Sequence, residues 1–114
     1  HLLEMVEHTG KSARIDTKKI PFFPEVPQSI GTGQIPGGLK ENLTYLLPSL
    51  QLSKDLEEWR LKGLCDPQTS GGLLFTIPAS LAEKCLNHLQ REGLSESALI
   101  GEIISREAKS IILE

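Results

Sequence analysis

Apolar residues recur at helical spacing in several parts of the chain. The clearest case covers residues 79–92, where leucines and one cysteine share a face and Gly93 follows as a stop signal. The same spacing predicts helices over 1–9, 27–33 and 53–64. These stretches are too short for independent stability, so each needs a partner surface for its apolar face.

The helix over 53–64 carries a more detailed expectation. Ser53 is placed to cap its N-terminus, and Leu56, Trp59 and Leu64 form one buried face. The charged residues expected in solvent are Asp55, Glu57, Glu58, Arg60 and Lys62.

Short apolar runs between the helices predict strands at 12–16, 73–77, 97–105 and 109–113. The run at 73–77, LLFTI, is wholly apolar apart from its threonine and ends at Pro78, which predicts a core strand. Gly101 is expected at a bulge or a close contact. Together the elements predict an α/β or α+β fold, a mixed β-sheet packed with helices, in one domain over 1–114.

A polar loop, CDPQTSGG at 65–72, separates the helix over 53–64 from the run at 73–77. Its carboxylate, hydroxyls and paired glycines suit a loop that grips phosphate or a metal on phosphate. The candidate binding residues are Asp66, Gln68, Thr69, Ser70, Gly71 and Gly72. The loop is not a P-loop, because it lacks the Lys-Ser/Thr pair. A plain turn, in which Asp66 and Thr69 bond backbone groups, is the alternative that the residues alone favour.

A second glycine pair follows Pro36 and precedes a lysine and an asparagine. The candidate residues of an anion-binding turn are Gly37, Gly38, Lys40 and Asn42. A plain turn with a surface lysine is the favoured alternative, since one lysine is weak support for an anion site.

Composition limits the classes of function. The 114 residues carry a net charge of −3 and only 4% aromatics, which gives no support for nucleic-acid binding. No apolar run reaches membrane-spanning length, and two cysteines suit free thiols in a reducing cytoplasm. No residue pair has the spacing of a metal site or of an acid–base pair, so no catalytic residue or metal ligand is predicted.

Three stretches resemble the selenophosphate synthetase family, whose members are selenide, water dikinases. LCDPQTSGGLL at 64–74 resembles the family signature, and IPGGLKENLTYL at 35–46 resembles its VPGGTRRNL stretch. HLLEM at 1–5 resembles the helix that follows the family's TDVTGFGLLG segment, and IGEI at 100–103 fits a late strand. The resemblance covers nearly the whole chain. It departs at Leu39-Lys40, where the family has Thr-Arg, which weakens any anion contact there.

The resemblance implies a C-terminal α/β domain of the aminoimidazole ribonucleotide synthetase superfamily. Its partner would be its own N-terminal ATP-binding domain, in a full-length homodimer that uses ATP and Mg²⁺. That enzyme makes selenophosphate, AMP and phosphate from selenide, ATP and water, with a catalytic Cys and Lys near its N-terminus. A first helix without an N-cap after His1 likewise suggests chain upstream. Cys65 is therefore not the catalytic cysteine, and this chain alone is expected to be inactive and to bind no cofactor.

Two alternatives stay open from the sequence. The chain could come from a related superfamily kinase or synthetase with another acceptor. It could also be a structural or dimerisation domain, in which DPQTSGG serves only as a turn.

Overall fold

The structure is a computed structural model that describes residues 1–114. Five α-helices and four strands follow one another along the chain, with two short 3₁₀ turns, η1 and η2. The elements are α1 (Leu2–Val6), β1 (Lys11–Ile15), η1 (Thr17–Lys19), α2 (Val26–Gly31), α3 (Gly37–Leu46), η2 (Leu47–Ser49), β2 (Leu50–Leu52), α4 (Glu58–Leu64), α5 (Ala79–Arg91), β3 (Gly101–Ser105) and β4 (Ile111–Leu113).

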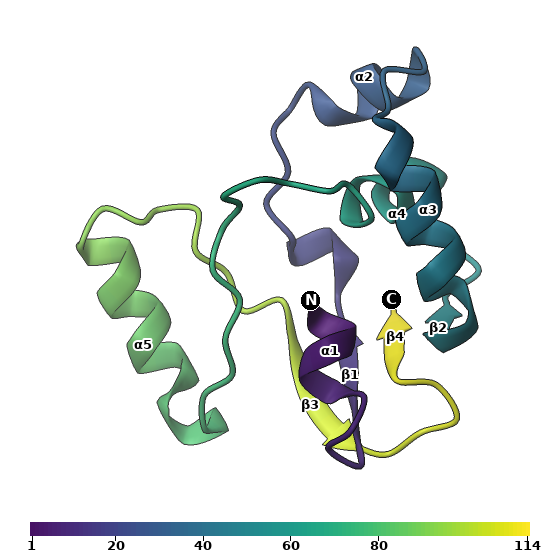
Figure 1. Cartoon of the computed structure of the whole chain (residues 1–114). Coiled ribbons are helices and arrows are strands. Elements are labelled where there is room, and N and C mark those ends of the chain that lie inside the picture. The colour runs from purple at the N-terminus through teal and green to yellow at the C-terminus, as the bar shows by residue number, and fades with distance from the viewer.

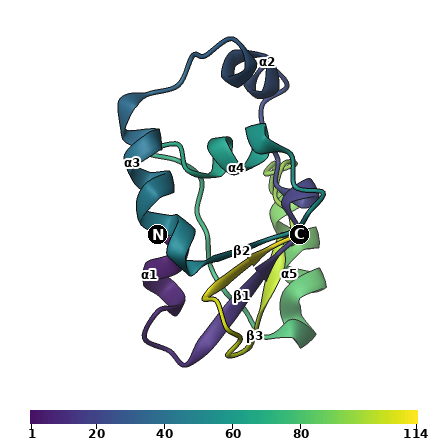
Figure 2. The same ribbon diagram turned by 90° about the vertical axis from the view of Figure 1, so that its right-hand side faces the viewer.

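The four strands form one mixed sheet in the order β2-β4-β1-β3 (Figures 1 and 2). β1 pairs antiparallel with β3 and parallel with β4, and β4 pairs parallel with β2. The last strand of the chain therefore lies inside the sheet rather than at its edge. The prediction of a mixed sheet with helices is confirmed, and the strands expected near 12–16 and 109–113 are present.

The core lies between α1 and one face of the sheet. Alternation along β1 turns Ala13 and Ile15 toward the helix, where they meet Leu3 and Val6. Strand residues of β2 and β4 complete this cluster, namely Leu50, Ile111 and Leu113. The apolar side chains of these strands cover the buried face of α1 and so hold a helix of only five residues.

Two buried hydroxyls tie the C-terminal strand to the N-terminal half of the chain. The Ser12 hydroxyl donates to the Lys109 carbonyl at 2.7 Å, just before β4. The Thr17 hydroxyl donates to the Glu114 carbonyl at 2.6 Å, just after it. Both side chains are almost fully buried, so each bond also satisfies a group that could not reach water.

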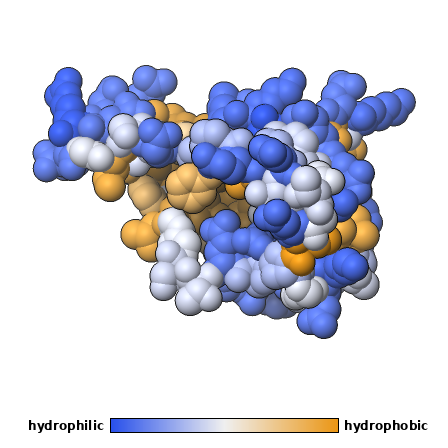
Figure 3. Space-filling view, turned by 90° about the horizontal axis from the view of Figure 1, so that it is seen from above, coloured by the Kyte–Doolittle hydropathy of each residue, from blue (hydrophilic) through white to orange (hydrophobic).

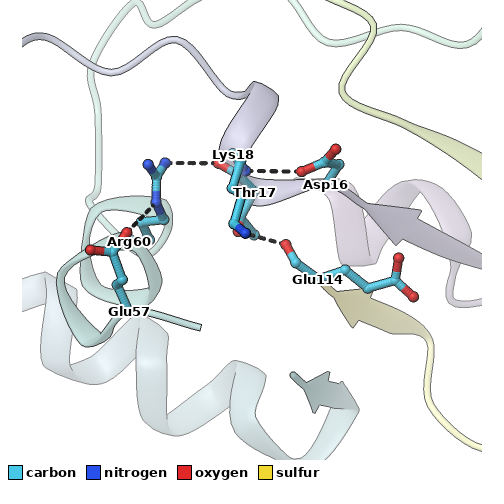
Figure 4. Close-up of polar contacts among 6 residues, drawn as sticks. All are labelled: Asp16, Thr17, Lys18, Glu57, Arg60 and Glu114. Atoms are coloured by element: carbon cyan, nitrogen blue, oxygen red, sulfur yellow. Dashed lines mark hydrogen bonds and ion pairs between the residues drawn. The ribbon is translucent and has the colours of Figure 1, made fainter. Parts of the chain in front are cut away.

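Arg60 links α4 to Thr17 of η1, the short turn that follows β1 (Figure 4). Its guanidinium donates to the Thr17 carbonyl at 2.9 Å and to the Glu57 carboxylate at 2.8 Å. It also stacks 4.4 Å from the Trp59 ring centroid, while Trp59 packs edge-on against Phe22 at 5.3 Å. The expectation that Arg60 lies in solvent is wrong, because its side chain is only 19% exposed.

Residues 66–100 extend away from the sheet and from α1–α4, and they form an arm that contains α5 (Figure 1). The segment 66–78 runs past the β3 side of the sheet to α5, which stands apart from the other helices (Figure 1). The helix predicted over 79–92 is confirmed as Ala79–Arg91, and Gly93 follows with a φ of +94°. The core strand predicted at 73–77 is wrong for this structure: the run joins no strand, and Leu73 is 96% exposed.

Three other expectations are corrected by the observed bounds of the elements. The helix predicted over 53–64 begins at Glu58, because the Ser53 hydroxyl and carbonyl hold a turn through the N–H groups of Asp55 and Leu56. The glycine pair after Pro36 forms the first turn of α3 rather than a separate turn. The strand predicted over 97–105 begins at Gly101.

Gly101 makes the close contact that its position in the sequence predicted. A Cβ built there collides with the Arg14 carbonyl oxygen of the neighbouring strand. We expect Gly101→Ala to lower the free energy of unfolding by about 1–3 kcal/mol, because backbone cannot move aside as a side chain can. Urea unfolding measures this loss. Gly31→Ala is the matched control: no atom lies within 4 Å of its added methyl, so an equal loss there would contradict the steric argument.

The Arg60–Glu57 pair also predicts a pH dependence. The hydrogen bond from Arg60 is the main cause that holds the pKa of Glu57 below its usual value. The stability from this pair is therefore present above the usual glutamate pKa and is lost as pH falls through the lower folded value. We expect Glu57→Gln to unfold at lower urea than the parent at neutral pH and to show a smaller difference in acid. A constant difference across that range would show that the pair's charge is not responsible.

Candidate functional site

The two glycine-containing motifs of the sequence meet at one place in the structure. Asn42 of α3 donates from its side-chain amide to the Cys65 carbonyl at 3.0 Å. Four residues earlier on α3, a Cβ built on Gly38 would lie 3.3 Å from the Pro67 ring. The glycine thus allows the first turn of α3 to pack against the start of the polar loop at 66–72, and Asn42 fixes that start by a side-chain bond.

The loop turns tightly immediately after this anchor. The Gln68 N–H donates to the Asp66 carbonyl at 2.9 Å, and the Gln68 side chain fills the space beside Gly71. Ser70 is the one non-glycine residue of the chain with a positive φ, at +58°. The loop therefore has a defined backbone conformation at its N-terminal end, held by backbone geometry and by Gln68.

Three polar side chains of the loop do not help to hold its conformation. The side chains of Asp66, Thr69 and Ser70 make no hydrogen bond within the chain. Residues 67–72 are exposed and Asp66 is half-buried. A carboxylate and two hydroxyls are thus presented together on one exposed loop, where they can accept or donate hydrogen bonds to another molecule.

The four residues predicted for an anion-binding turn do not all come together. Gly37 and Gly38 form the uncapped first turn of α3, and Asn42 faces the polar loop. Lys40 lies two residues from Asn42, about 200° around the helix. It lines a shallow hollow on the outer face of α3 with Glu41, Thr44 and Tyr45. The lysine charge therefore lies on a different face from the contact with the polar loop.

Neither cysteine is set up as a nucleophile. Cys65 is buried at the C-terminus of α4, and burial raises the pKa of its thiol. Cys85 is half-buried on the apolar face of α5, and the two thiols are free. No three His, Cys, Asp or Glu side chains gather closely enough to hold a metal ion. No helix has both the length and the apolar character needed to cross a membrane.

Sequence reasoning singled out Asn42 and the polar loop separately but missed that they touch. Twenty-three positions separate Asn42 from Cys65, and no periodicity relates them. A hydrogen bond from a helix side chain to a distant carbonyl leaves no mark on a single sequence. Only packing of α3 beside the end of α4 brings the two motifs together.

Comparison with protein families gives one match that covers the chain. Residues 1–114 match the family described as "AIR synthase related protein, C-terminal domain". The mixed sheet and the order of helices and strands described above agree with such a domain.

The similar curated proteins are named selenide, water dikinase. The protein from Myxococcus xanthus is 40% identical over 103 residues, which is 90% of this chain and 29% of that protein. The protein from Clostridioides difficile is 31% identical over 97% of this chain and 32% of its own length. The Carboxydothermus hydrogenoformans protein is 37% identical over 98% and 32%. This chain spans about a third of the length of the curated relatives it matches. The resemblance drawn from the three sequence stretches is confirmed.

The different surroundings of the two thiols predict different reactivity. Cys65 is 3% exposed and its pKa is raised, so iodoacetamide should modify Cys85 first in the folded chain. We expect a rate difference on the order of tenfold or more by mass spectrometry of the tryptic peptides. In urea the two rates should converge. Faster labelling of Cys65 than of Cys85 in the folded chain would contradict its assignment as a structural thiol.

Proposed function

Because the chain belongs to the family of AIR synthase-related C-terminal domains, we propose that it is the C-terminal domain of a selenide, water dikinase. That enzyme makes selenophosphate, AMP and phosphate from selenide, ATP and water. The observation that carries the proposal is the match with proteins of that name along 90–98% of this chain, at 31–40% identity. The loop at 66–72, the family marker of the sequence, is also presented on the surface.

In this proposal the loop at 66–72 closes against the ATP site of an N-terminal domain. Asp66, Thr69 and Ser70 carry side-chain oxygens that have no partner within the chain, so they suit contacts to a bound nucleotide or to that domain. The bond from Asn42 to Cys65 holds the start of the loop and so sets its direction. These residues orient and enclose, while bond-breaking belongs to groups outside residues 1–114.

ATP and Mg²⁺ enter the proposal only through the full-length enzyme. The ion would neutralise charge on the transferred phosphates when it is bound. The candidate loop contains one carboxylate, Asp66, and no second carboxylate, histidine or cysteine joins it in a metal-binding group. Residues 1–114 therefore do not fit a complete metal site, and no step is assigned to the ion here.

The proposal treats residues 1–114 as a single C-terminal domain whose partner is its own N-terminal ATP-binding domain. The full-length enzyme would act as a homodimer in the cytoplasm. The share of the relatives that this chain spans, about 30%, supports a further domain that holds the rest of the active site. The isolated chain should then release no phosphate from ATP beyond a heat-killed control.

The departure from the family pattern at Leu39-Lys40 bears on the nearest alternative, a related synthetase with another acceptor. Leu39 is buried in the interior, so the family's threonine is replaced at a packed position. Lys40 lies on the outer face of α3. Neither change falls on the contact between Asn42 and the loop, and selenide therefore remains the proposed acceptor.

The test uses the full-length protein that contains residues 1–114. We expect selenide-dependent AMP formation, and we expect Asp66→Ala and Thr69→Ala to lower kcat/KM on the order of tenfold without changing the urea midpoint. Lys54→Ala is the control, because this exposed residue lies in the turn before α4, outside the candidate loop. AMP formation that does not depend on selenide would favour another acceptor. Unchanged catalysis with lowered stability would favour the structural alternative.

A further inference from the structure

The polar face of α5 carries hydrogen-bond donors and positive charge that the chain itself does not use. Lys84, His88 and Arg91 follow one another at one-turn intervals, within about 60° of one another around the helix. Together with Asn87 they line one shallow hollow, and all four side chains are exposed. None of the four takes part in an ion pair. The one side-chain hydrogen bond from α5 comes from Gln90.

The carboxylates of this segment do not neutralise the hollow. Glu83 lies about 100° around the helix from Lys84, and Glu92 follows the last helical residue as the C-cap. Neither glutamate lines the hollow or forms an ion pair. The chain as a whole has a net charge of −3, so this face is a local positive surface on an acidic protein.

Stabilisation of the helix end does not account for these cations. His88 and Arg91 lie in the last turn, where basic side chains often bind the final carbonyl oxygens. Here the backbone satisfies those carbonyls: the N–H groups of residues 92–94 donate to carbonyls of residues 88–90 at 3.0 to 3.2 Å. Lys84 lies a further turn away from that end. The side chains are therefore free to bind another molecule.

The position of α5 leaves this face open to solvent. The helix stands apart from the other helices (Figure 1). Viewed from above, hydrophilic side chains cover the outer side of the α5 arm, while apolar side chains line the recess between the arm and the main body (Figure 3). Cys85 and Leu89, on the apolar face of the helix, are half-buried. A ligand can therefore approach the polar face without displacing any packed side chain.

We propose that the hollow formed by Lys84, Asn87, His88 and Arg91 binds a linear polyphosphate anion. The lysine supplies a point charge, and the forked guanidinium of Arg91 matches two phosphate oxygens. The Asn87 amide and a ring N–H of His88 add donors between them. The helix rises about 10 Å from residue 84 to residue 91. A chain of linked phosphates spans both cations, whereas a single phosphate is shorter than this separation.

The surroundings favour a phosphate chain over a macromolecule. Residues 79–91 include no aromatic residue, so the bases of a nucleic acid would have no ring on which to stack. No apolar residue lines the hollow, so an acidic peptide would find no apolar anchor there. Inorganic tripolyphosphate and the triphosphate end of a nucleotide share the chemistry that this face recognises. The inference concerns α5 alone and does not rest on the proposed enzyme activity.

An NMR titration of the 114-residue chain with sodium tripolyphosphate in low-salt buffer tests the site. We expect saturable shifts at the amides of residues 84–91 and none at the loop of residues 66–72. Lys84→Gln and Arg91→Gln should each raise Kd about threefold, and the double variant about tenfold, because single exposed ion pairs are weak. Glutamine favours helix about as well as lysine and arginine do, so α5 should persist in these variants.

The double variant Lys11→Gln/Lys54→Gln is the matched control. It removes the same charge from exposed lysines outside α5 that form no ion pair. Its Kd should stay within about twofold of the parent value, because distant exposed charges are largely screened. An equal loss in this control, or shifts that never saturate, would overturn the proposal and show only a solvated, charged helix face.

Each other outcome also decides the question. Orthophosphate that binds as tightly as tripolyphosphate would overturn the assignment to linked phosphates. Saturable shifts confined to residues 66–72 would place the anion on the candidate loop instead. Tighter binding of oligouridylate than of tripolyphosphate would assign the face to RNA. Given binding at residues 84–91, competition by ATP would support the site with a nucleotide as the source. Its absence would support the site with an inorganic chain. If a variant fails to fold, the location of the wild-type shifts gives the answer.

Discussion

The rest of the structure depends on how the last strand is held inside the sheet. β4 lies between β1 and β2, and Ile111, Ile112 and Leu113 are all buried. Two buried hydroxyls fix its ends, from Ser12 to the Lys109 carbonyl and from Thr17 to the Glu114 carbonyl. Because these bonds join positions 97 residues apart, the sheet is complete only when the end of the chain has found its place.

This frame positions the candidate loop through a short series of contacts. Thr17 leads directly to Arg60, whose guanidinium donates to the Thr17 carbonyl (Figure 4). The same guanidinium stacks on the Trp59 ring. Arg60 thereby locates α4, and the end of α4 presents Cys65 to Asn42 of α3. The loop at 66–72 thus begins from a rigid point and then extends into solvent, which suits a segment that meets another domain.

The arm beyond the loop differs physically from this frame. The frame satisfies its polar groups and buries its apolar strands, whereas the arm leaves leucines, a phenylalanine and a strand edge exposed. In β1 and β4, the segments that the sequence predicts as strands form strands, and their apolar side chains are buried. At 73–77 the residues favour a strand, but the segment joins no sheet and Leu73 is exposed. Such a disagreement marks a segment that has no partner surface within the frame.

The sequence by itself determined the elements that depend on local pattern. These include the amphipathic helix ending at Gly93, the strands around Ala13 and Ile112, the close contact at Gly101 and the family marker at 64–74. Only the tertiary structure decided the strand order, the burial of Arg60, the contact of Asn42 with Cys65 and the exposure of 73–77. The reason is that periodicity records which residues need burial, while long-range pairing decides which surface buries them.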